Sequence, residues 1–226
     1  MTYQKFLKEY SILILLIIIG ALLRLKYLSL PFWIDEVLFY NWVTKTPKQA
    51  FFPVLLFKFY GLFVDLKNPV LLRLPFVAAG LGCISVVWFY FKNYYIRIFM
   101  ATLMACFPLF VYWSAIAKIY VFAWLLIALA WKWKFFYILL ALTTPVGVVG
   151  FNFFEIKKNY KIYLLSIGII GLLFIFRGDT ERNFLDWRFM SHAKRIWSVF
   201  IFSAVMHIMQ FIDTKRLGKG IRKKKV

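Results

Sequence analysis

The sequence is poor in acidic, cysteine and histidine residues. It has 9 Asp and Glu against 29 Lys and Arg, and only 2 Cys and 2 His in 226 residues. Cys83 and Cys106 both stand inside apolar runs, so we expect packed, reduced thiols rather than a disulfide framework. His192 and His207 have no metal-ligand spacing with other residues, and no set of three carboxylates demands a metal ion. These absences leave few residues on which chemistry could depend.

Apolar residues dominate what remains. The chain is 63% hydrophobic and 22% aromatic, far more than a soluble domain needs, so its long apolar runs indicate membrane spans. The net charge of +20 would suggest a nucleic-acid partner in a soluble protein. In a membrane protein it indicates cytoplasmic loops and contact with anionic lipid, and we expect no nucleic acid. With no repeat and no low-complexity linker, residues 1–226 are predicted to form a single integral-membrane domain.

The hydropathy pattern predicts an all-α polytopic bundle of about eight membrane segments. No cleavable signal peptide is expected, because Arg24 and Lys26 follow the first apolar run where a small-residue cleavage site would stand. The predicted spans are Tyr10–Leu30, Val70–Phe91, Ile98–Trp113, Ile119–Trp131, Ile162–Phe176 and Ile196–Ile212, with a further segment at Phe135–Ile156.

The segment Phe135–Ile156 has two interpretations, one span or a broken pair around Thr143-Thr144-Pro145. Basic residues favour the cytoplasmic side of a membrane, and a returning pair keeps both later basic clusters there. We therefore favour a re-entrant hairpin with both termini cytoplasmic. The first external loop is then 31–68, the second is 177–195, and the basic tail 214–226 is a topology and lipid anchor.

The first external loop is too long for a simple connector. Two short amphipathic helices, Ile34–Thr44 and Pro53–Leu66, are predicted to lie in the membrane interface. The second is interrupted by Lys58 and Gly61 and ends near Asp65. At about 14 residues it is short for a span, which needs about 20.

The stretch Trp33-Ile34-Asp35-Glu36 opens that loop with two adjacent carboxylates. An ionisable group at a membrane is a functional hypothesis by default, and we interpret Asp35 as a general base facing the non-cytoplasmic side. The alternative is a solvated loop in which Asp35 caps the next helix.

Four ordered pieces between Leu23 and Leu129 resemble the integral-membrane glycosyltransferases of the GT-C class. The likeness is to protein O-mannosyltransferases and aminoarabinose transferases, in a short form. The pieces are Leu23-Arg24-Leu25 followed by Pro31-Phe32-Trp33-Ile34-Asp35-Glu36, then Pro53-Val54-Leu55-Leu56-Phe57, then Arg73-Leu74-Pro75, then Pro108-Leu109-Phe110-Val111-Tyr112-Trp113-Ser114 with Lys118-Ile119-Tyr120. The chain departs from the family at Ala115-Ile116-Ala117, where a polar or acidic residue is common, and at Phe52, where aminoarabinose transferases have Lys.

The resemblance implies sugar transfer from a polyprenyl-phosphate donor to an acceptor outside the cytoplasm. Asp35 is the implied base, and Glu36 orients it or binds sugar hydroxyls. The implied donor-phosphate ligands are cationic or hydroxyl-bearing: Lys118, Arg73, Tyr120 and Arg24. Competing interpretations remain open, because Arg24 can snorkel or face an internal polar site, and Arg73 can pair with Asp35 or Asp65.

Two other functions stay open on the sequence alone. One is a transporter or lipid flippase, although such proteins usually show repeats and matched broken helices. The other is a non-catalytic lipid-binding membrane subunit, which the short length favours. No cofactor is predicted, although related oligosaccharyltransferases use a divalent metal. The sugar, the acceptor and the homo- or hetero-oligomeric state do not follow from the sequence.

Overall fold

A computed structural model of the chain describes residues 3–45, 52–116, 120–143, 150–176 and 199–215. All regular structure in these ranges is helical, which confirms the predicted all-α class. The helices are α1 (Tyr3–Leu28), α2 (Ile34–Lys45), α3 (Phe52–Tyr60), α4 (Pro69–Tyr90), α5 (Tyr94–Cys106), α6 (Pro108–Ala115), α7 (Tyr120–Lys132), α8 (Phe136–Thr143), the 3-10 turn η2 (Phe153–Glu155), α9 (Ile156–Phe176) and an unlabelled helix over residues 199–215.

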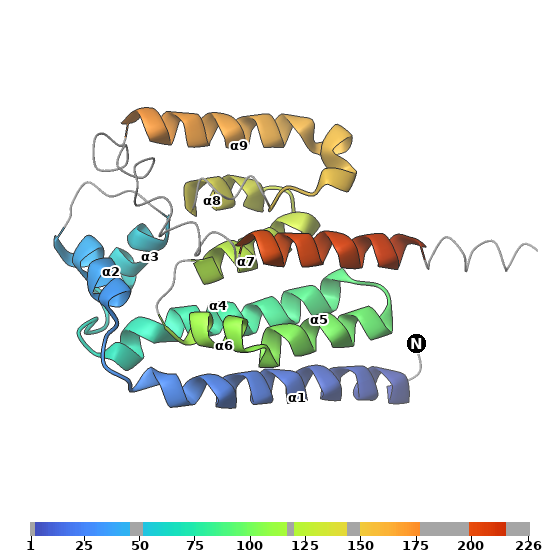
Figure 1. Ribbon diagram of the computed structural model, residues 1–226, viewed down its shortest axis with the longest axis horizontal. Coiled ribbons are helices and arrows are strands. Elements are labelled where there is room, and N and C mark those ends of the chain that lie inside the picture. The colour runs from blue at the N-terminus through green and yellow to red at the C-terminus, as the bar shows by residue number, and fades with distance from the viewer. Residues whose placement is uncertain (1–2, 46–51, 117–119, 144–149, 177–198, 216–226) are drawn as a thin grey trace, which may run out of the picture.

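The long helices lie roughly side by side along the long axis of the molecule (Figure 1). Helix α4 is central and packs against α1, α5 and α7, while α8 lies between α7 and α9. The start of α1, the α4–α5 turn, the start of α9 and the end of helix 199–215 lie at one end of the bundle, which we call the basic end (Figure 1). Helices α2 and α3 lie at the other end (Figure 1).

Two helices within the described ranges are long and apolar enough to cross a membrane, Tyr10–Leu28 and Pro69–Tyr90. Their bounds agree with those of the first two predicted spans to within a few residues. The third predicted span is a bent pair, because α5 and α6 meet at an angle of 51°. Pro108 begins α6 and has no N–H to continue the ladder from α5. Counting the pair as one gives up to 3 candidate spans, fewer than the eight segments predicted, since α7 has 13 residues and α8 has 8.

Helices α2 and α3 form as the sequence predicts, but α3 is shorter than expected. It ends at Tyr60 rather than near Leu66, and the chain turns at Gly61. Both helices bury aromatic side chains against α4: the rings of Phe39 and Phe57 are 5.0 Å apart, and each lies within 5.5 Å of Phe76. This contact fixes the α2–α3 pair on the bundle.

Residues 150–152, which precede η2 and α9, lie beside α7 and α8. Helix α8 ends at Thr143, and Phe151 and Asn152 are not helical, so no straight helix runs from 135 to 156. Residues 144–149, which include Pro145, lie outside the described ranges. Asn152 N–H donates to the Tyr137 hydroxyl at 3.1 Å, and Trp131 Nε1 donates to Gly150 O at 2.7 Å. Residues 150–152 therefore lie near the place where α8 begins.

Helix 199–215 is fastened to the basic end by a buried carboxylate. Asp213, 7% exposed, accepts hydrogen bonds from the backbone N–H groups of Lys92 and Asn93 at 3.1 and 3.0 Å. These N–H groups lie between α4 and α5, where no helical carbonyl serves them. Asp213 thus ties the last described helix to the turn between the second and third candidate spans.

Candidate functional site

The centre of the candidate site is a buried ion pair between α2 and α4. Arg73 Nε donates to Glu36 Oε1 at 2.7 Å, and Arg73 Nη2 donates to Glu36 Oε2 at 2.6 Å. Both side chains are 0% exposed. Two parallel bonds of this kind are the strongest and most directional arrangement open to an arginine and a carboxylate. The sequence suggested Asp35 or Asp65 as the partner of Arg73. The structure instead pairs Arg73 with Glu36.

The remaining N–H groups of Arg73 serve the end of α1 and the chain that follows it. Nη1 donates to the carbonyls of Tyr27, Leu28 and Leu30 at 2.7, 2.9 and 2.6 Å, and Nη2 to that of Pro31 at 3.0 Å. The last carbonyls of a helix have no partner inside it and carry partial negative charge. Arg73 therefore caps the C-terminus of α1 and holds the segment that connects α1 to α2.

Glu36 also begins helix α2. Its Oε2 accepts the backbone N–H of Trp33 at 2.8 Å, while the Trp33 carbonyl accepts from the N–H groups of Glu36 and Val37. This is the reach-back half of a capping box, with Trp33 at the N-cap in place of Ser or Thr. The Glu36 carboxylate thus caps the start of α2 and also joins α2 to Arg73 of α4.

Arg24 makes a second internal cluster, deeper along α1. It is 0% exposed, and Nε donates to Ser114 Oγ at 2.6 Å. Nη2 donates to Met104 O at 3.0 Å, and Nη1 to Gly20 O and Ala105 O at 2.7 and 3.3 Å. Met104 O would take the N–H four residues on, which Pro108 lacks. Arg24 therefore satisfies backbone groups exposed by the bend between α5 and α6, so it faces an internal polar site rather than snorkelling.

Gly80 makes this cluster sterically possible. A Cβ at Gly80 would lie 2.5 Å from Ser114 Cβ, 2.8 Å from Ser114 Oγ and 3.3 Å from Arg24 Nε. Only a glycine in α4 leaves room for α6 and the guanidinium to approach this closely. Gly80 was not predicted, because nothing in an apolar helix pattern distinguishes a glycine needed for close contact from one that is merely tolerated.

Of the other predicted site residues, the structure describes Tyr120 and the backbone of Asp35, but not Lys118. Asp35 lies in the first turn of α2, directly before Glu36, and its side chain is outside the described part of the structure. Lys118 also lies outside the described ranges. Tyr120 begins α7, with its ring 5.8 Å from that of Trp113 in α6. The structure therefore brings Glu36 and Arg73 together, and Arg24 joins a separate cluster.

Aromatic rings from three elements gather near the Glu36–Arg73 pair. The Tyr112 ring of α6 lies 5.6 Å from Tyr27 of α1 and 6.0 Å from Trp33, in edge-to-face arrangements. Trp33 is 50% exposed, so this cluster reaches the surface. Aromatic faces at a surface can stack on apolar or sugar-like ligands, and the pairs also stabilise the junction of α1, α2 and α6.

No group of three or more His, Cys, Asp or Glu that could hold a metal ion occurs among the described residues. His207 Nε2 accepts the Phe153 N–H of η2 at 3.3 Å, and Nδ1 lies 2.7 Å from Ser203 O, one turn earlier in the same helix. Its ring packs at 4.6 Å against Trp131. His207 is thus an interhelical packing residue.

Comparison with known proteins identifies no relative: no family model matches, no curated protein matches and no solved structure matches.

Proposed function

We propose that the chain is a membrane glycosyltransferase that uses a polyprenyl-phosphate-linked sugar, with Asp35 as general base. The acceptor hydroxyl or amine attacks the anomeric carbon while the Asp35 carboxylate takes its proton. The sugar–phosphate bond breaks, and the polyprenyl phosphate leaves with the bonding electron pair. Lys118 and Tyr120 are the proposed ligands of the phosphate, as a point charge and a hydrogen-bond donor.

One observation carries the proposal. Three of the four sequence pieces that resemble the GT-C class are far apart in the chain, yet they meet in two buried polar contacts. Glu36 of the first piece binds Arg73 of the third, 37 residues away, and Arg24 binds Ser114 of the fourth, 90 residues away. Residues of the resembling pieces therefore meet in the folded chain, and the Glu36–Arg73 pair fixes the helical turn that carries Asp35.

The contacts of the two arginines change the roles that we assign them. All five N–H groups of Arg73 face protein acceptors, and Arg24 directs its own toward Ser114 and three carbonyls. Neither side chain is exposed. We therefore assign Arg73, Arg24 and Glu36 to positioning, and leave phosphate binding to Lys118 and Tyr120.

The proposed topology places about eight segments in the membrane, with Phe135–Ile156 as a re-entrant hairpin. The elements at the basic end carry many cations, which supports a cytoplasmic location for that end. These cationic residues are Lys92, Arg97, Lys132, Lys134, Lys157, Lys158, Lys161 and Lys215. Both termini then face the cytoplasm in a multi-pass protein, and Asp35 faces the opposite side.

A non-catalytic lipid-binding membrane subunit is the second candidate. The observation that favours it is that Arg24 and Arg73, two of the four predicted phosphate ligands, already bind protein groups. A transporter or flippase has less support, because the described helices show one bent pair rather than matched breaks in two halves.

The direct test is reconstitution in liposomes with short-chain polyprenyl-phosphate sugars that differ in the sugar, together with a membrane extract as the source of acceptors. The proposal predicts release of polyprenyl phosphate together with labelled sugar on an acceptor. Lipid binding without release would favour the subunit, and movement of the intact donor across the bilayer would favour the transporter.

A further inference from the structure

A pocket of about 370 Å³ lies between α2, α3 and the turn that follows α3, and we call it the α2–α3 pocket. Its size falls within the usual range for small-molecule sites, about 300 to 1,000 Å³. It is separate from the Glu36–Arg73 pair, since it is formed by the second half of α2. Its lining residues are Tyr40, Val43, Thr44, Phe57, Lys58, Gly61, Leu62, Val64, Asp65 and Leu66.

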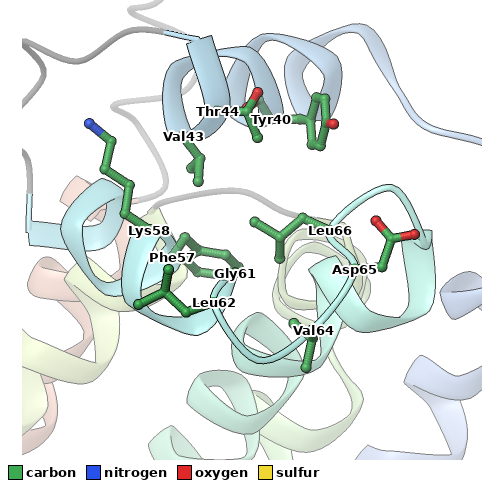
Figure 2. Close-up of a pocket in the computed structure, with 10 residues that line it drawn as sticks. All are labelled: Tyr40, Val43, Thr44, Phe57, Lys58, Gly61, Leu62, Val64, Asp65 and Leu66. Atoms are coloured by element: carbon green, nitrogen blue, oxygen red, sulfur yellow. The ribbon is translucent and has the colours of Figure 1, made fainter.

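The pocket has an apolar floor and a polar rim. Val43, Phe57 and Leu66 are buried, at 6%, 0% and 6% exposure, and belong to the core. Figure 2 shows Lys58 and Asp65 at opposite edges of the pocket, with these apolar side chains between them and the Lys58 side chain extending outward beside α2. A ligand seated here would meet a cation at one side and a carboxylate at the other.

Hydrogen bonds and close packing hold the wall of the pocket in place. Gly61 N–H donates to Phe57 O at 2.8 Å, and the Tyr60 hydroxyl donates to Leu71 O at 3.1 Å. A Cβ at Gly61 would lie 2.8 Å from Leu66 Cδ1, so glycine permits the turn to close against the floor. A preformed pocket costs little ordering entropy when it binds a ligand.

The rim offers hydrogen-bond acceptors on one side. Thr44 Oγ1 donates its hydrogen to Tyr40 O at 2.8 Å, so its lone pairs remain to accept. Asp65 Oδ1 accepts the Lys67 N–H at 2.9 Å, which leaves most of the capacity of this exposed carboxylate for another donor. An ammonium group suits these acceptors, and a phosphate suits the Lys58 ammonium.

An apolar surface borders the pocket. Phe59, Leu62 and Phe63 are 63%, 76% and 72% exposed, and the rings of Phe59 and Phe63 lie 5.2 Å apart. Exposed apolar residues on helices that lie at a membrane surface contact lipid chains. A ligand with its head in the pocket would thus lay its chains over these three side chains.

We propose that the α2–α3 pocket binds a phosphoethanolamine lipid, with the ammonium at Asp65, the phosphate at Lys58 and the chains on Phe59, Leu62 and Phe63. A purely anionic headgroup would place negative charge beside Asp65. A choline headgroup has no N–H to donate to Asp65 or Thr44. The site does not depend on glycosyl transfer, so it stands or falls separately from the proposed function.

The test is native mass spectrometry of the purified full chain in detergent, titrated with dihexanoyl phosphatidylethanolamine, phosphatidylglycerol and phosphatidylcholine in parallel. We expect phosphatidylethanolamine to bind about tenfold more tightly than either of the others, as one charge-assisted hydrogen bond allows. Free phosphoethanolamine should bind more weakly than the lipid, because it lacks the chains. Equal binding of the three lipids, or of the free headgroup, would overturn the proposal.

Variants locate the site. Asp65→Asn and Lys58→Gln should each weaken phosphatidylethanolamine binding about tenfold, and Asp65→Asn should also remove the preference over phosphatidylglycerol. Lys67→Gln is the matched control, because Lys67 is exposed but its side chain does not line the pocket. Each variant is first checked for an unchanged unfolding midpoint. Unchanged binding in Asp65→Asn, or an equal loss in Lys67→Gln, would place any lipid elsewhere.

Discussion

The Glu36 carboxylate and the Arg73 guanidinium face each other through two parallel hydrogen bonds of 2.7 and 2.6 Å, and neither residue is exposed. Arg73 also caps α1, and Glu36 also begins α2. The pair therefore connects α1, α2 and α4 at the point where α2 leaves the bundle. Asp35 precedes Glu36 in the same helical turn, so the pair sets the backbone position of the proposed base.

Loss of one member of this pair should be costly. Glu36→Gln leaves the buried Arg73 charge without a counterion, and breaking a buried pair in this way costs about 3 to 5 kcal/mol. Arg73→Lys keeps the charge but loses the two-pronged geometry and most of the α1 capping. Both variants should lower the thermal unfolding midpoint in detergent, measured by tryptophan fluorescence.

The matched control for that experiment is Glu155→Gln. Glu155 forms an ion pair with Lys134 at 2.5 Å, but the two side chains are 34% and 26% exposed. Partly exposed pairs contribute about 1 kcal/mol or less. If Glu36→Gln were no more destabilising than Glu155→Gln, the Glu36–Arg73 pair would not be the joint that we describe.

Gly80 should be intolerant of even one added carbon. Gly80→Ala would place Cβ 2.5 Å from Ser114 Cβ, and overpacking of this kind costs about 1 to 3 kcal/mol. Gly168→Ala is the matched control, because no atom lies within 4 Å of its added Cβ in α9. The control should be neutral or stabilising by up to about 1 kcal/mol, since alanine favours helix. Chemical denaturation of both variants measures the difference, and equal effects would contradict the close α4–α6 contact.

Acid should weaken the contact between the α7–α8 turn and η2. Burial acts to raise the pKa of Glu155, but the hydrogen bond and charge of Lys134, the Asn159 amide and the Lys158 charge outweigh it, so the pKa is lowered. A lowered pKa stabilises the folded protein above the unfolded value, about 4.3, and this stabilisation is lost as pH falls through the folded pKa. The stability difference between the parent and Glu155→Gln should therefore shrink on acidification from about pH 5. A difference that grows with acid would reverse the assigned sign.

The proposed topology predicts opposite labelling of the two ends of the bundle. Leu62 is 76% exposed at the α2–α3 end, and Lys158 is exposed at the start of α9. In a Cys106→Ala background, a cysteine at position 62 should react in intact cells with a membrane-impermeant maleimide. A cysteine at position 158 should react only after permeabilisation. The opposite pattern would invert the topology and remove Asp35 from the non-cytoplasmic side.

The sequence predicted those features that depend on local pattern. Long apolar runs predicted α1 and α4 closely, and the Pro108 break explains why the third span is bent rather than straight. The early end of α3 was missed, because Gly61 was read as an interruption of a helix and instead closes a turn against Leu66.

The polar contacts could not be predicted from local sequence pattern, because they join residues that are far apart in the chain. Arg73 pairs with a carboxylate 37 residues away, and Asp213 with backbone groups about 120 residues away. Adjacent carboxylates look equivalent in sequence, yet Glu36 is buried in a structural joint, while the proposed catalytic role stays with Asp35. Which of two neighbouring side chains faces the core depends on the tertiary position of the helix, which hydropathy alone does not define.

The measurement that tests the central claim is sugar transfer by Asp35→Asn, compared with the parent in the same liposomes, together with polyprenyl-phosphate binding. Asn keeps the shape of Asp but cannot take a proton at neutral pH, and loss of a general base typically costs about 10²- to 10⁴-fold in rate. The account predicts a loss of transfer of that size with binding unchanged, whereas Lys118→Ala should weaken both. A stable Asp35→Asn variant that binds polyprenyl phosphate and transfers sugar at the parental rate would contradict it.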